Sequence, residues 1–162
     1  MSDHWGDLIE ILDPIFYVLK DCDPDGVEFY WASGGDPQPL RFPSTKEMLL
    51  EAEKKERQFK QEQTDIGVRL DAILADYGLK LASKNRHHRP RRPMNIYIFT
   101  DGIWAAGGDA ATPIKKMVRG LNKHGLSRNQ VGIQFISFGH NPDALQRLAQ
   151  LDLLAEDREV GM

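Results

Sequence analysis

This sequence has little cysteine, no long apolar run and only a small net charge. Its one cysteine, Cys22, cannot form a disulfide within the chain, which suits a reducing compartment. No apolar run approaches membrane-spanning length, and the N-terminus lacks a signal-peptide pattern. The formal net charge of −3 argues against a general nucleic-acid-binding protein. We therefore expect a cytoplasmic protein without a membrane segment.

The composition is that of a folded globular protein. The chain has 162 residues, of which 41% are hydrophobic and 28% are charged. This length is enough for one hydrophobic core, and no internal repeat is recognisable. We therefore predict a single domain over residues 1–162.

The first third of the chain predicts two helices and a hairpin. Apolar residues recur every three or four positions from Trp5 to Leu19, which is typical of an amphipathic helix, and Pro14 predicts a kink or a late start. Residues 27–33 alternate as a strand does, and 40–42 can form the returning strand of a hairpin. Ser44 can cap a second, surface helix.

The rest of the chain alternates helices and strands. Residues 64–82 carry a helical stripe, and 94–100 and 131–139 are short and apolar on both alternations. Such strands are typical of parallel sheets buried on both faces. A helix lies between the two strands, and His140 or Asn141 can cap a last one. This order predicts an α/β fold with a parallel sheet and right-handed crossovers.

Two oxygen-bearing residues are candidate ligands, and one of them lies beyond the carboxyl end of a strand, where such folds bind ligands. Asp101 follows the strand 94–100, and Thr64 precedes a core helix. Hard oxygen atoms of this kind suit Mg²⁺ or Mn²⁺. Spacing alone also allows a structural interpretation, in which Asp101 turns the chain and Thr64 caps the helix.

Four stretches in order resemble the von Willebrand factor A (vWA) domain, in particular its fungal and other intracellular members. "IYIFTDG" looks like the Thr-Asp-Gly strand end of that family, and "TDIGVRLDAIL" resembles its threonine loop and helix. "VGIQFISFGHNPDALQRLAQLD" resembles the strand and helix that come next in the family. "DPIFYVLKDCDPDGVEFYWAS" resembles the family's first helix and second strand. The resemblance covers nearly the whole chain.

The resemblance implies a Rossmann-like, mostly parallel sheet with an antiparallel edge hairpin and helices on both faces. It also implies a non-enzymatic protein-binding module with a metal-ion-dependent adhesion site, in which Thr64 and Asp101 match two ligands of Mg²⁺ or Mn²⁺. There the ion binds a carboxylate of a protein partner. Partner contacts would come from Ser33, Gly102 and Trp104, with Trp104 either an exposed anchor or packed under its loop. The loops concerned are 33–36, 64–67, 102–109 and 139–143.

The first motif of the family, Asp-x-Ser-x-Ser, is absent from this sequence. "MSDHWGDLIEILD" already resembles the stretch that follows that motif, and the end of the chain stops near an expected final strand. We therefore expect a domain trimmed at both ends, without its first, central strand and with an incomplete metal site. Another chain can supply such a strand, because unpaired backbone groups are costly when buried.

Two alternatives stay open. The first is an α/β hydrolase or phosphotransfer enzyme that uses Asp101, which requires a second acid or base facing this carboxylate. The second is a non-functional fragment of a longer vWA protein.

Overall fold

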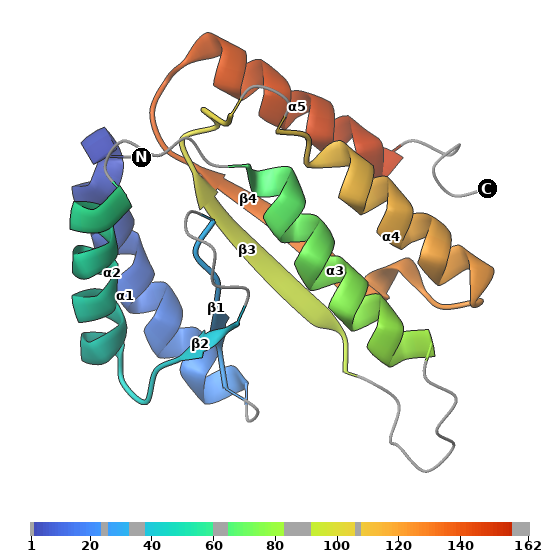
Figure 1. Cartoon of the computed structure of the whole chain (residues 1–162), viewed down its shortest axis with the longest axis horizontal. Coiled ribbons are helices and arrows are strands. Elements are labelled where there is room, and N and C mark those ends of the chain that lie inside the picture. Colours follow the sequence, from blue (N-terminus) through green and yellow to red (C-terminus); the bar gives the residue numbers. More distant parts are fainter. Residues whose placement is uncertain are drawn as a thin grey trace. The chain divides into compact units, whose positions relative to one another are not determined.

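The computed structural model describes residues 2–23, 26–32, 38–59, 65–82, 92–105 and 108–156. These residues form a mixed α/β structure with five α-helices, a parallel pair of strands and an antiparallel hairpin (Figure 1). The chain divides into two compact units, Met1–Thr64 and Asp65–Met162. The single domain stays a prediction. None of the described helices is both long and apolar enough to cross a membrane.

The first unit contains two contacting helices. Helix α1 (Trp5–Cys22) follows a 3-10 turn (Ser2–His4) and continues through Pro14, so the predicted late start is wrong. The helix begins at Trp5, where the apolar periodicity begins, and its buried residues are Leu8, Leu12 and Phe16. Helix α2 (Thr45–Phe59) contacts α1. The backbone N–H of Glu47 donates to Ser44 Oγ over 3.3 Å, which confirms Ser44 as the cap.

The predicted hairpin is present but short. Strand β1 (Glu28–Phe29) pairs antiparallel with β2 (Leu40–Arg41) through only two residue pairs. The Phe29 ring lies 5.2 Å from that of Phe16 and 5.4 Å from that of Phe42, measured between centroids. The alternation at 27–33 therefore matches Glu28 and Phe29, which are exposed and half-buried, and overestimates the paired length of the strand among the described residues.

The second unit is built around a strand–helix–strand motif. Strands β3 (Met94–Thr100) and β4 (Val131–Ser137) are parallel, in a register that places Thr100 opposite Ser137. Helix α4 (Ala111–Lys123) and a 3-10 turn (Arg128–Gln130) connect the strands. Helices α3 (Ile66–Ala82) and α5 (Pro142–Glu156) precede and follow them. The predicted parallel pair is thus confirmed.

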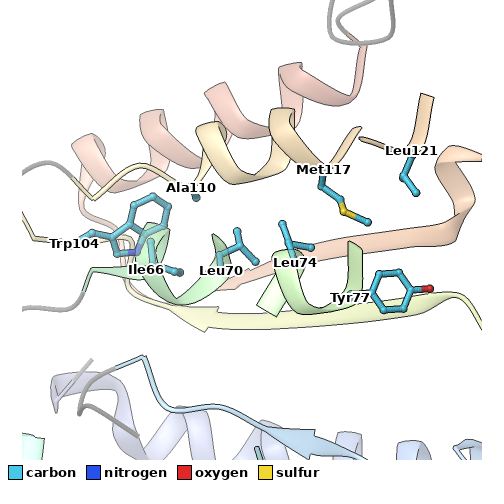
Figure 2. Close-up of a cluster of buried hydrophobic side chains, with 8 residues drawn as sticks. All are labelled: Ile66, Leu70, Leu74, Tyr77, Trp104, Ala110, Met117 and Leu121. Atoms are coloured by element: carbon cyan, nitrogen blue, oxygen red, sulfur yellow. The ribbon is translucent and has the colours of Figure 1, made fainter. Parts of the chain in front are cut away.

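The core of the second unit lies between the sheet and its helices (Figure 2). Helix α3 supplies the apolar stripe that its sequence predicts, and α4 faces it across the core. Partly buried residues of both strands and of α5 pack against this cluster. The buried members of the cluster are Ile66, Leu70, Leu74, Tyr77, Trp104, Ala110, Met117 and Leu121.

The prediction that both strands are buried on both faces is wrong. Ile96, Ile98 and Ile133 face the core, whereas Asn95 and Gln134 on the alternate positions are exposed. The Tyr97 side chain, also on this second face, is 38% exposed. A short apolar run has too few positions for its periodicity to separate one-sided from two-sided burial.

Candidate functional site at the carboxyl end of β3

The last residue of β3, Thr100, organises the turn that follows it. Its side chain is only 5% exposed, and its carbonyl oxygen accepts a hydrogen bond from Phe138 N over 2.9 Å. Its hydroxyl oxygen accepts two more, from Gly102 N over 3.0 Å and from Trp104 Nε1 over 2.9 Å. Sequence reasoning passed over Thr100, although a threonine directly before Asp-Gly at a strand end is the available signal.

Asp101 and Gly102 turn the backbone away from the sheet. The half-buried Asp101 accepts a hydrogen bond at Oδ1 from Ile103 N over 3.0 Å, which is the geometry of an Asx turn. Gly102 has φ +72°, and a Cβ there would lie 2.6 Å from Ala144 Cβ. The structure thus shows that Asp101 turns the chain, as the structural interpretation predicts. A role in metal or partner binding stays a prediction.

Helix α5 contacts this turn and stabilises it. Its first residues are capped by Asn141, whose Oδ1 accepts from Asp143 N over 3.0 Å and from Ala144 N over 3.1 Å, which confirms one of the two predicted caps. Arg147 Nη1 donates to the Gly102 carbonyl oxygen over 2.8 Å. The Arg147 guanidinium carbon also lies 5.2 Å from the centroid of the Trp104 ring system.

Trp104 is not an exposed anchor. Its side chain is 8% exposed, lies 6.2 Å from the Phe135 ring between centroids, and sits beside Ile66 in the core (Figure 2). The second of the two predicted alternatives, packing under the loop, is the one observed. The neighbouring Ile103 is 60% exposed, so among the described residues of the loop it offers a large apolar side chain to solvent. The sequence could not separate the two, because the turn sends consecutive side chains in different directions.

The loop before α4 meets the beginning of α3. A Cβ at Gly67 would lie 2.5 Å from the Asp109 carbonyl oxygen, so only glycine permits this approach. Asp65 Oδ1 accepts from Val68 N over 3.2 Å and thereby caps α3. The structure thus brings together parts of two loops that the vWA resemblance assigns to partner binding.

The Asp109 carboxylate caps α4. Its oxygens accept from Ala111 N over 2.8 Å and from Thr112 N over 3.2 Å, and also from the Thr112 hydroxyl. The hydrogen bond from the Thr112 side chain, followed by those from the two backbone groups, lowers the pKa of Asp109 below its usual value, although burial opposes this shift. Asp109 therefore stays ionised at neutral pH and acts as a structural cap.

Two predicted site residues, Ser33 and Thr64, lie outside the described residues. Within the described ranges, no group of three or more His, Cys, Asp or Glu residues is arranged to hold a metal ion. Asp101 contributes one carboxylate, of which Oδ1 already accepts the Ile103 N–H. Among the described residues, Asp101 is therefore not part of a group of three or more such side chains.

Comparison of the chain with family models finds no match, and comparisons with curated proteins and with solved structures find no significant match. The turn after β3 is therefore the feature of the chain that bears most directly on function. That turn has a fixed backbone, a half-buried carboxylate at Asp101 and an exposed apolar side chain at Ile103.

Proposed function

We propose that this chain is a non-enzymatic protein-interaction module of the vWA type, with an incomplete metal-ion-dependent adhesion site. One observation carries the proposal, namely the Asp101–Gly102 turn at the carboxyl end of β3 in a parallel strand–helix–strand unit. Ligands of open α/β sheets bind at this edge. The exposed thiol of Cys22 fits the expected reducing, cytoplasmic location.

The rigidity of the turn supports a binding role. Thr100 and Arg147 hold its backbone from two sides, so a partner would bind a surface that is already ordered. Ile103 offers apolar area, and Asp101 offers a carboxylate beside it. In the proposed module, Mg²⁺ or Mn²⁺ would bridge Asp101 to a partner's carboxylate only where further ligands complete the site.

A Rossmann-like sheet is the finer part of this proposal. Among the described residues, β3 and β4 pair only with each other. A parallel sheet is normally larger and covered, and an edge strand can template another strand. We therefore include strand addition by another chain among the modes in which the module engages a partner.

A photo-crosslinking amino acid at position 103 tests the loop interaction. The matched control carries it at Leu153 on α5, which lies outside the loops assigned to partner binding and is 62% exposed against 60% for Ile103. We expect crosslinks in an extract of the producing cells to one discrete protein from position 103 and not from position 153. Asp101→Ala should reduce the yield by disturbing the turn.

The outcomes separate the parts of the proposal. Equal crosslinking from both positions, or none from position 103, would contradict the loop as a binding surface. Loss of the crosslink in a chelator, restored by Mg²⁺ or Mn²⁺, would assign a bridging ion. A crosslink that persists in the chelator would assign the contact to the loop alone.

An α/β hydrolase or phosphotransfer enzyme remains the alternative, because Asp101 occupies the edge of the sheet where catalytic carboxylates also lie. The loop after β4 reaches the same edge, since Thr100 lies opposite Ser137 in the parallel register. Metal-dependent turnover of a panel of phosphoesters, lost in Asp101→Asn, would favour this alternative. An absence of turnover in the unchanged protein as well as in Asp101→Asn would weigh against it.

A further inference from the structure

A surface groove runs between α3 and α4, away from the turn after β3. It has a volume of about 360 Å³, and both helices line it along their lengths. The two helices lie side by side and contact each other (Figure 1). None of the described residues of the range 100–109 lines the groove, so it is a different surface from the part of the proposed loop site that the structure describes. Its floor consists mainly of Leu74, Gly78, Met117, Gly120 and Leu121.

Small residues leave the groove open. A Cβ added at Gly120 would meet no heavy atom within 4 Å, and one at Gly78 would meet only Met117 Sδ, at 4.0 Å. Leu74, Met117 and Leu121 belong to the core cluster, so an occupant would contact the core directly. Leu79 also lines the groove and is 74% exposed, so it offers apolar surface that an occupant would cover.

The charge beside the groove is positive. Residues 111–123 of α4 contain four lysine or arginine residues and no acidic residue. Lys116 Nζ lies 2.8 Å from Asp71 Oδ1 at one end of the groove, so that pair is neutral overall. Arg119 and Lys123 are exposed on the same helix, and the exposed His124 lines the other end of the groove. The charges of Arg119 and Lys123 would attract an acidic partner and steer its approach.

The length of the groove matches a short helix. Its lining on α4 extends from Pro113 to His124, which corresponds to about 16 Å or three helical turns. An amphipathic helix presents apolar side chains at i, i+3 or i+4 and i+7 over such a length. We propose that the α3–α4 groove binds an acidic amphipathic helix of a partner protein, with its apolar stripe over Gly78 and Gly120.

A designed probe tests this directly. The probe is a fluorescein-labelled, end-capped helical peptide of about four turns, with leucine on one stripe and glutamate at most other positions. Fluorescence anisotropy should show saturable binding to the full chain. A peptide with lysine in place of every glutamate should bind at least about tenfold more weakly, since opposite charges are lost. Added salt should weaken the binding of the glutamate peptide.

Two substitutions locate the binding. Gly120→Leu fills the groove and should weaken peptide binding at least about tenfold. Its matched control is Gly6→Leu in α1, where an added Cβ likewise meets nothing within 4 Å, and this variant should bind as the unchanged protein does. Leu79→Glu provides an independent variant, because its exposed position tolerates the change and the new charge repels the peptide.

The result that overturns the proposal is equally specific. It fails if the peptide does not bind, or if it binds Gly120→Leu and Leu79→Glu as well as it binds the control. It also fails if the chain self-associates in sedimentation and both groove variants abolish that association, because the occupant would then be a second copy. Circular dichroism of each variant identifies any that does not fold, and the other variant then decides.

Discussion

Glycines behave oppositely in two regions of the second unit. In the turn after β3, Gly102 has φ +72° and would place a Cβ 2.6 Å from Ala144 Cβ. In the α3–α4 groove, a Cβ at Gly120 would meet nothing within 4 Å. The first glycine is required by backbone conformation and close packing. The second leaves a space beside its helix, although the helix would be more stable with another residue in place of glycine. This is the pattern expected of a surface kept open.

The largest expected effect comes from Gly102→Ala. The substitution forces an alanine into a left-handed conformation and against Ala144, so we expect the unit to lose about 3 kcal/mol of stability or more. Urea denaturation followed by Trp104 fluorescence measures this loss. A change below about 1 kcal/mol would show that α5 can move away from the turn.

This measurement needs a background in which Trp104 is the only tryptophan. Trp5 and Trp31 lie in the first unit, and the indole nitrogen of each is buried without a hydrogen-bond partner among the described residues. Replacing both with phenylalanine removes two unsatisfied donors, so the double variant should fold with little loss of stability. Trp104 then reports on the second unit alone.

Thr100→Val should have the next largest effect. Valine keeps the shape of threonine but removes the oxygen that accepts from Gly102 N and Trp104 Nε1. Leaving these donors unpaired should cost about 1–3 kcal/mol, measured by the same denaturation. Thr100→Ser keeps the oxygen and should lose less. Equal losses in both variants would show that the methyl group, and not the hydroxyl, stabilises the turn.

Asp109→Ala should cost about 1 kcal/mol, because α4 loses its N-terminal cap. The pKa of Asp109 is lowered in the folded chain, so its contribution is present above the unfolded pKa and is lost as the pH falls through the folded value. The stability difference between the unchanged protein and the alanine variant should therefore shrink below about pH 4.

Asp109→Asn is the matched control for this prediction. Asparagine retains the capping oxygen, so it should preserve more of the stability at neutral pH than alanine does. It does not titrate, so this variant should lack the share of the acid-induced loss that belongs to Asp109. Thermal denaturation followed by circular dichroism from pH 2.5 to pH 7 measures both effects, and identical pH profiles for all three proteins would contradict the assignment.

Gly120→Ala should have the smallest effect and the opposite sign. The alanine side chain has room, and alanine favours the helix over glycine by about 0.5–1 kcal/mol. We therefore expect a slightly higher midpoint in urea denaturation. A destabilising result would mean that the groove closes around Gly120 in solution, which would sharpen the contrast with Gly102.

Local patterns predicted most of the secondary structure. The stripe at 64–82 specified α3 because helical periodicity is a local property, and the run at 94–100 matched β3 to the residue. The caps Ser44 and Asn141 were also predictable, since a capping side chain bonds to backbone within its own turn. The short paired length of the hairpin strands was not, because pairing depends on another segment of the chain.

The candidate site was predicted only in part. The positions of Asp101 at a strand end and of Gly102 in a turn follow from the sequence. The side chains that pack around them do not. The burial of Trp104 depends on Phe135 and Arg147, which lie far along the chain and approach it only when β4 and α5 pack. The role of the Thr100 hydroxyl depends in turn on the indole that it binds.

The sequence by itself determined where α3, β3, α4, β4 and α5 form and that a carboxylate follows β3, because propensity, periodicity and capping act over a few residues. Only the tertiary structure decided that Ile103 and not Trp104 faces solvent, that one face of the sheet is covered by helices, and that a groove lies open between α3 and α4. Burial is a property of elements packed together, and a local pattern carries no information about the partner against which it packs.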